Sequence, residues 1–182
     1  MPRIEHIYDP AERFVVGTVG QPGERTFFVQ ARSAQRLISV ALEKSQVNAL
    51  CQRIEMMIRE VKKDDPGILL ERLIRDDAPL ETPIFEEFRV GMISLSWLRD
   101  RRLLCIEFHA ISEEDSQSEG AIFQLDNENR DLVKVFISLS QADAFSTRAV
   151  AVVKAGRLPC PFCAIPIDPT GHLCPRANGY RR

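Results

Sequence analysis

The chain has 182 residues, enough for one ordinary domain with an appendage and too few for two large domains. Hydrophobic residues make up 45% and charged residues 27%, a balance that is typical of a globular protein and excludes a disordered or fibrous one. The formal net charge of −2 excludes a strong overall attraction to nucleic acid or to anionic lipid.

Membrane and export signals are absent from the sequence. No apolar run approaches the ~18 residues of a membrane span, and the first residues lack the apolar centre of a signal peptide. The five cysteines, three of them clustered, fit a reducing compartment, where clustered thiols bind metal more often than they form disulfides. We therefore expect a cytoplasmic protein that has no membrane partner. The sequence carries no signal for an oligomeric state.

The first half of the chain predicts three strands and a helix. Two β-rich runs, Arg13–Val19 and Thr26–Ala31, are joined by a turn-forming Gly/Pro segment and predict a hairpin. A third strand is expected over Leu37–Leu42. Apolar residues then recur every three or four positions up to Val61, which predicts an amphipathic helix with Ser45 as its N-cap.

The second half predicts the same order of elements. Strands are expected over Phe88–Trp97, Leu103–Ile111 and Leu132–Ile137, and a second helix should begin at an N-cap formed by Ser140.

Two segments fall outside this order. The stretch 113–131 contains seven acidic residues against one arginine and predicts a solvated loop. The apolar residues within 66–79 predict a short helix that connects the two halves.

The two halves also match in sequence. A displacement of 95 residues places 37–54 over 132–149, with identities that include Ser45 over Ser140 and Gln46 over Gln141. Any strand followed by an amphipathic helix would share part of this register, but the common Ser-Gln pair favours duplication.

These elements predict an α+β fold. Two pseudo-repeated βββα units, at about 13–63 and 86–156, should share a mainly antiparallel sheet or partial barrel with two packed helices. Together they would form a core over residues 1–156. Residues 157–182 would then form a separate C-terminal element.

The C-terminal element (residues 157–182) has the composition of a metal site. Its spacing C-x2-C-x8-H-x-C is formed by Cys160, Cys163, His172 and Cys174. Three thiolates and an imidazole, with no free position, predict a closed zinc knuckle that holds a structural Zn²⁺ ion. Because the element has few apolar residues, metal binding must supply its folding free energy. The alternatives are an iron site or Fe–S cluster, a redox dithiol, or unbound thiols. A C-x-x-C that follows a helix among prolines argues against redox catalysis.

The end motif GRLPCPFCAIPIDPTGHLCPRANGYRR, together with FVVGTVGQPGERTFFVQA and VALEKSQV, resembles the actinobacterial family catalogued as domain of unknown function family 3090. The resemblance covers nearly the whole chain and implies a bacterial cytosolic protein with a C-terminal Cys/His motif. The family's name assigns no activity. One position departs from the usual knuckle, in which Gly follows C-P-x-C: here it is Ala164. A left-handed backbone at that alanine would cost ~1 to 2 kcal/mol.

Catalytic signatures are absent. The sequence has no Walker loop, no G-x-S-x-G or H-E-x-x-H motif and no dinucleotide fingerprint. Glu107 and His109 would lie on one side of a strand as a proton-transfer pair, but a lone strand histidine is more often structural. Cys51 and Cys105 are expected to serve as small hydrophobic residues. We therefore assign no catalytic residue and favour a non-enzymatic protein.

The end of the chain is basic. From Arg157 onward four arginines stand against one acidic residue, a net charge of +3 that leaves −5 for the rest. Guanidinium, aromatic and amide groups in such a segment suit RNA or single-stranded DNA. The candidate partner-binding residues here are Arg176, Asn178, Tyr180, Arg181 and Arg182, and the second hairpin turn would extend the surface with Arg99, Arg101 and Arg102.

These features predict a zinc-containing binding or adaptor protein with a protein or nucleic-acid partner. The alternative is an enzyme, or an enzyme subunit, with a small-molecule pocket between the two repeats.

Overall fold

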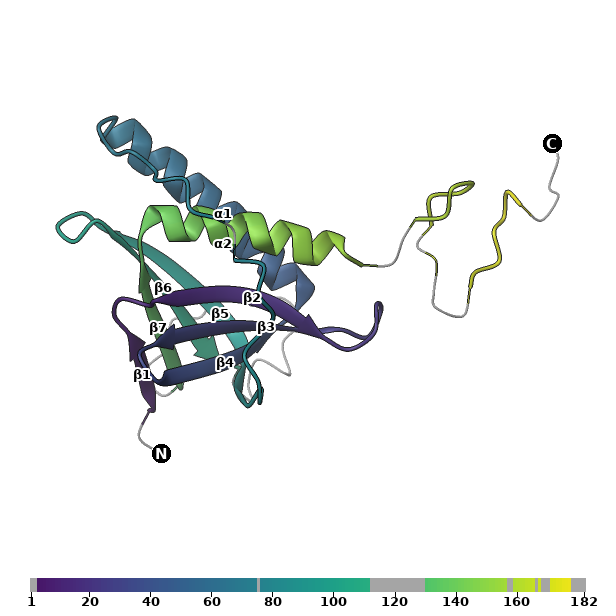
Figure 1. Cartoon of the computed structure of the whole chain (residues 1–182), viewed down its shortest axis with the longest axis horizontal. Coiled ribbons are helices and arrows are strands. Elements are labelled where there is room, and N and C mark those ends of the chain that lie inside the picture. Colours follow the sequence, from purple (N-terminus) through teal and green to yellow (C-terminus); the bar gives the residue numbers. More distant parts are fainter. Residues whose placement is uncertain are drawn as a thin grey trace.

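A computed structural model describes residues 3–74, 76–111, 130–156, 159–165, 167 and 171–177. In these ranges the chain forms one mixed sheet with two helices packed on one of its faces (Figure 1). The elements in chain order are β1 (Glu5–Tyr8), β2 (Arg13–Val19), β3 (Thr26–Ser33), β4 (Arg36–Leu42), α1 (Lys44–Asp64), β5 (Glu86–Leu98), β6 (Leu103–Ala110), β7 (Leu132–Ile137) and α2 (Leu139–Lys154). None of the helices in the described ranges is long and apolar enough to cross a membrane. The predicted acidic loop falls outside these ranges, apart from its last two residues.

The strands follow the order β1-β7-β6-β5-β4-β3-β2. Each half of the chain contributes an antiparallel meander, β2-β3-β4 or β5-β6-β7. The meanders meet where β4 pairs with β5 in parallel, and β1 pairs in parallel with β7. The sheet is therefore mixed, and it contains a strand, β1, that the sequence pattern did not predict.

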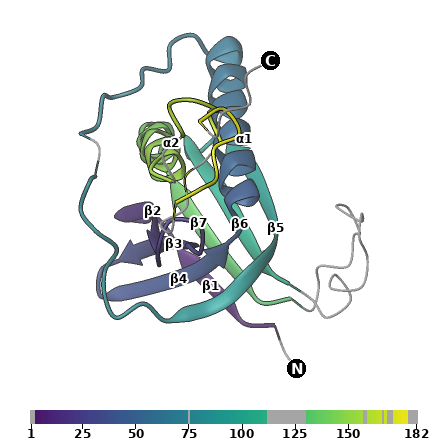
Figure 2. The same cartoon turned by 90° about the vertical axis from the view of Figure 1, so that its right-hand side faces the viewer.

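The segment between β1 and β2 makes backbone hydrogen bonds to strands near both edges of the sheet. The N–H of Ala11 donates to the carbonyl of Phe136 on β7 at 2.9 Å, and the N–H of Glu12 donates to the carbonyl of Arg32 on β3 at 2.9 Å. One short stretch thus contacts strands from both halves, and the sheet curves around its core (Figure 2).

Both halves contribute to a single core. The helical stripe predicted for α1 is confirmed, and its buried members are Val47, Leu50, Cys51, Ile54, Met57, Ile58 and Val61. At the centre, the ring of Phe14 on β2 stacks on Phe145 of α2 with 4.4 Å between centroids. Phe14 also meets Phe108 of β6 at 6.2 Å. The core therefore ties an edge strand of the first half to the helix and central strand of the second.

The helices begin earlier than the sequence suggested. The N-caps are Glu43 and Ser138, each two residues before the predicted caps Ser45 and Ser140, so that prediction was wrong. The reason is the glutamine three residues after each true cap. Gln46 Oε1 accepts the N–H of Glu43 at 2.8 Å, and Gln141 Oε1 accepts that of Ser138 at 2.9 Å. Each glutamine thereby closes a capping box that fixes the start of its helix.

The connection between α1 and β5, residues 65–85, is an irregular strap. Its described residues contain no helix, so the predicted helix within 66–79 was wrong. Tertiary contacts explain the extended path: the side-chain amide of Gln30 donates to the carbonyl of Glu81 at 2.9 Å and accepts its N–H at 2.8 Å. Leu80 sits over Gly17, where a Cβ atom would approach Leu80 Cγ to 2.6 Å. The part of the strap around Leu80 and Glu81 therefore covers the face of β2 and β3 opposite the helices.

Candidate metal centre

The three cysteines and the histidine of the C-terminal element come together. One ligand atom from each residue lies within 4.8 Å of all the others. Cys160 Sγ is 3.7 Å from Cys174 Sγ, and Cys163 Sγ is 3.2 Å from His172 Nε2. Ligand atoms of a tetrahedral zinc site are roughly 3.5 to 3.8 Å apart, given the usual zinc–sulfur and zinc–nitrogen bond lengths. The four residues are thus positioned to hold one metal ion.

The first two ligands are held by a tight turn. Ala164 N–H donates to the carbonyl of Cys160 at 2.8 Å, and Cys160 N–H donates to the carbonyl of Ile165 at 2.8 Å. The N–H of Phe162 points at Cys160 Sγ, at 3.5 Å. Ala164 has a φ of 61°, the left-handed backbone considered above for this position. Its Cβ atom therefore strains the turn, because glycine adopts this conformation without that cost.

Cys174 opens a second turn of related sequence. Pro175 follows it as Pro161 follows Cys160 in the first turn. Ala177 N–H donates to the carbonyl of Cys174 at 3.2 Å and lies 3.3 Å from its Sγ. Arg176 Nη1 donates to the carbonyl of Phe162 at 3.2 Å, which links the second turn to the first.

The surroundings of Cys160 and Cys163 shift the pKa values of their thiols in opposite directions. Burial acts to raise the pKa of Cys160, but hydrogen bonds from the backbone of Cys163 and Phe162 and from the thiols of Cys163 and Cys174 together hold it below its usual value. Burial raises the pKa of Cys163. Because the thiolate is the species that binds a metal, a lowered pKa favours the ligand form of Cys160.

The described part of the C-terminal element has no apolar core. Its buried residues are two of the ligands, Cys160 and Cys174, whereas Phe162 is 62% exposed and Leu173 is 87% exposed. The element extends beyond the end of α2, away from the sheet (Figure 1). Among the described residues, the contacts within the element are therefore mainly those among the four candidate ligands and the backbone hydrogen bonds around them.

The candidate partner-binding residues do not form one surface in the described part of the chain. Arg99 pairs with Asp64 at 2.6 Å, and Arg101 makes two hydrogen bonds to Asp9 at 2.6 and 2.8 Å. The turn between β5 and β6 that carries both arginines lies at the end of the molecule opposite the C-terminal element (Figure 1). Arg102 lines a small cavity beside Trp97 in the same turn region.

The remaining candidates are at the C-terminus. Arg176 is engaged with the carbonyl of Phe162, as described above. Asn178, Tyr180, Arg181 and Arg182 lie outside the described residues.

The side chains of Glu107 and His109 lie on the same side of β6. His109 Nε2 is 3.7 Å from Glu107 Oε2, beyond hydrogen-bond distance, and Glu107 is instead held by Lys134 at 2.9 Å and Ser94 at 3.0 Å. Burial lowers the pKa of His109.

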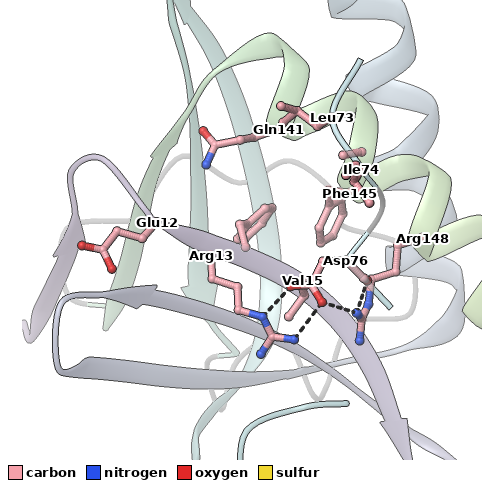
Figure 3. Close-up of a pocket in the computed structure, with 11 residues that line it drawn as sticks. Glu12, Arg13, Val15, Leu73, Ile74, Asp76, Gln141, Phe145 and Arg148 are labelled. Atoms are coloured by element: carbon pink, nitrogen blue, oxygen red, sulfur yellow. Dashed lines mark hydrogen bonds and ion pairs between the residues drawn. The ribbon is translucent and has the colours of Figure 1, made fainter. Parts of the chain in front are cut away.

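A polar cluster that the sequence did not predict holds the strap. Arg13 of β2 donates to both carboxylate oxygens of Asp76, at 2.6 and 3.2 Å (Figure 3). Arg148 of α2 lies within 3.4 Å of the same carboxylate, contacts the Asp76 carbonyl, and donates to the carbonyls of Val16 and Ala78 at 2.7 and 2.8 Å. Hydrogen bonds from Arg13 hold the pKa of Asp76 below its usual value, although burial opposes them.

The sequence carried one signal for this cluster. Arg148 falls within the buried stripe of α2 and is 7% exposed. A charged residue on a buried stripe requires a partner, and here the partner is Asp76.

A cavity of about 200 Å³ adjoins the cluster between β2, α2 and the strap (Figure 3). Its lining includes Phe14, Leu73, Ile74 and Phe145, and no histidine, cysteine, serine or lysine of the described chain contributes to it. The guanidinium nitrogens of Arg13 donate hydrogen bonds to the carboxylates of Asp76 and Glu81 and to backbone carbonyls of the strap. The cluster is therefore arranged to anchor the strap.

Comparisons with known proteins give a match for most of the chain. No curated protein and no solved structure matches it. A family model does match residues 6–174, from the middle of β1 to the last of the four candidate ligands. The chain therefore belongs to the family described as protein of unknown function DUF3090, as its motifs had indicated.

Proposed function

We propose that this is a non-enzymatic binding or adaptor protein whose C-terminal element is organised by a structural Zn²⁺ ion. The observation that carries the proposal is the closed ligand set, with four protein ligand atoms within 4.8 Å of one another. A site with four protein ligands leaves no open position for a substrate or a reactive water. The exposed side chains beside it are available to a partner.

Zinc is the metal that this ligand set favours. Three thiolates and one imidazole are a common structural zinc combination, whereas iron–sulfur clusters are usually held by four thiolates. The Sγ–Sγ distance of 3.7 Å between Cys160 and Cys174 suits a single tetrahedral ion. Elemental analysis of the purified full chain should find close to one zinc per chain. Stoichiometric iron, or no metal in freshly purified reduced protein, would contradict the assignment.

We further propose that the core, residues 1–156, arose from two βββα units and that residues 157–182 depend on metal for their order. Equivalent glutamines support the duplication. Gln46 Nε2 donates to the carbonyl of Val90 at 2.9 Å, and Gln141 Nε2 donates to the carbonyl of Ala11 at 3.0 Å. Each therefore joins its own helix to a strand or junction of the other half. Superposition of 13–63 on 86–156 should align both helices on equivalent strands, and a mismatch in strand order would count against duplication.

A nucleic-acid partner is the second part of the proposal. The segment that would contact RNA or single-stranded DNA contains Arg176, Asn178, Tyr180, Arg181 and Arg182. Anisotropy of a labelled mixed-sequence RNA should show binding at low salt that weakens steeply as salt rises, because cations displaced from the phosphates are released. Replacement of Arg176, Arg181 and Arg182 by alanine should abolish it. Undetectable binding at low salt would remove nucleic acid as the partner.

Recovery of partners from native cells tests the adaptor function directly. A tagged full chain is compared with its Cys160→Ser variant, since loss of one ligand should disorder the element while the core stays folded. The function predicts proteins or nucleic acids that are recovered with the zinc-loaded chain and lost with the variant. An identical set recovered by both would show that the metal element is not the contact region.

A further inference from the structure

We infer that the C-terminal element presents an apolar docking surface, formed by Phe162, Ile165 and Leu173, for an apolar and acidic segment of a partner protein. This inference rests on the proposed adaptor function. It names the residues that make the contact and the chemistry of the segment that they would bind.

Exposure of large apolar side chains is the first observation. Phe162 is 62% exposed, Ile165 is 47% exposed and Leu173 is 87% exposed, in an element with few other apolar residues. Single exposed apolar residues are common on protein surfaces, but a group of them around one structured site is typical of an interaction surface. Here each of the three residues lies within two positions of a candidate metal ligand in the sequence.

The metal ligands hold this group in place. Phe162 directly precedes Cys163, and Leu173 directly follows His172. Because Cys163 Sγ and His172 Nε2 are 3.2 Å apart, the two apolar residues flank a single ligand pair.

Backbone hydrogen bonds add to this order. The carbonyl of Ile165 accepts the N–H of Cys160 at 2.8 Å, and the carbonyl of Phe162 accepts a hydrogen bond from Arg176 at 3.2 Å. A surface whose backbone is fixed before binding loses little conformational entropy when a partner arrives. The metal therefore has a role in binding as well as in folding.

Charge determines the class of partner. From Arg157 onward the chain has four arginines and a single acidic residue, Asp168. A complementary segment should carry carboxylates around its apolar residues, since interfaces pair opposite potentials around an apolar centre.

A single nucleic-acid strand fits this surface less well. Ile165 and Leu173 are aliphatic and provide no aromatic face on which a base could stack.

The test selects peptides from a displayed random 16-residue library on the zinc-loaded full chain. The enriched peptides should contain at least two large apolar residues and a net negative charge. Fluorescence anisotropy of a selected peptide should then show an affinity loss of about tenfold or more for Phe162→Ser with Leu173→Ser, the loss expected when central apolar contacts are removed. Each single variant is measured too, and zinc content is determined for every variant, so that loss of metal is separated from loss of the surface.

A matched control uses exposed apolar residues elsewhere. Leu69 and Ile74 of the strap are 87% and 96% exposed, and their replacement by serine should leave peptide affinity unchanged. Equal binding by zinc-loaded Phe162→Ser, Leu173→Ser and wild-type protein would overturn the inference.

Three other outcomes would also overturn the inference. The first is enrichment of basic peptides. The second is binding of a labelled mixed-sequence RNA that these serine variants weaken. The third is a wild-type dimer, seen by light scattering, that the variants convert to monomer, because the occupant would then be a second copy of the chain. If the variants keep their cellular partners while Cys160→Ser loses them, the adaptor function stands and only the docking surface fails.

Discussion

The sheet-and-helix core and the C-terminal element are stabilised by different means. In the core, Phe108 is fully buried and Phe145 is 2% exposed, so removal of apolar area from water supplies the free energy of folding. In the described part of the element, the buried residues are cysteines and the large apolar side chains face solvent. The core depends on packing, whereas under the proposed function the element depends on metal ligation, so the two regions should respond independently to perturbation.

Loss of a metal ligand should have the largest effect. Cys160→Ser removes a thiolate from a site whose metal binding is worth about 10 to 16 kcal/mol in comparable zinc peptides. We expect zinc content to fall well below one per chain and the NMR signals of the element to lose their dispersion. The Tm of the core should stay within about 2 °C of wild type. Cys105→Ala, at a cysteine outside the cluster, should retain the metal, and a large drop in core Tm for Cys160→Ser would contradict independence.

Truncation of a core side chain should lower the stability of the core and leave the metal content unchanged. Phe145→Ala removes the ring that stacks on Phe14 at 4.4 Å and should lower the free energy of unfolding by about 3 to 5 kcal/mol. Urea unfolding followed by circular dichroism measures the loss, and elemental analysis should still find one zinc per chain. Val150→Ala, on the exposed side of the same helix, should change stability by less than about 0.5 kcal/mol. A variant of Phe145 that also released zinc would show that the regions are coupled.

Removal of the strap anchor should have a smaller, pH-dependent effect. The folded pKa of Asp76 is lowered, so its contribution to stability is present above its unfolded pKa of about 4 and is lost as pH falls through the folded value. We expect Asp76→Asn to cost about 1 to 2 kcal/mol at neutral pH, since the carboxylate is partly exposed and screened. The cost should shrink as the pH falls below the unfolded pKa of about 4 and should disappear once the pH lies below the folded pKa of Asp76. A pH-independent difference would show that the charge is not responsible, and Asp100→Asn in an exposed turn is the control.

Relief of backbone strain in the metal element should have the smallest effect. Ala164→Gly removes a Cβ atom from a residue with a φ of 61° and should stabilise the zinc-bound turn by about 1 kcal/mol. Zinc transfer to a colorimetric chelator should slow by about fivefold. Ala177→Gly, in the second turn, should bring no such gain because Ala177 is not among the described residues with positive φ. Faster release from the Ala164 variant would contradict the strain argument.

Features set by local chemistry could be predicted from the sequence. The stripe of α1 and the strand Leu132–Ile137 follow from hydrophobic periodicity, which depends only on neighbouring residues. The four candidate ligands follow from spacing, since two thiols separated by two residues can face one ion from a single turn.

Features set by distant contacts could not be predicted in the same way. β1 exists because Glu5–Tyr8 pairs with β7, more than a hundred residues later in the chain. The strap is extended because Gln30 and two arginines bind its backbone and Asp76, and these contacts override a weak local helical pattern. The helix starts were missed by two residues because Gln46 and Gln141 close capping boxes with Glu43 and Ser138, so that Ser45 and Ser140 lie inside the helices.

The pairing of β1 with β7 has a consequence for biosynthesis. Glu5 lies opposite Leu132, so β1 leaves the ribosome long before β7, the strand with which it pairs. The β2-β3-β4 meander can pair as soon as it emerges, whereas one edge of the sheet stays open until translation passes Ile137. The metal ligands emerge later still. A nascent chain that stalls within the second half therefore exposes an unpaired strand edge, the kind of surface on which chaperones act and aggregation begins.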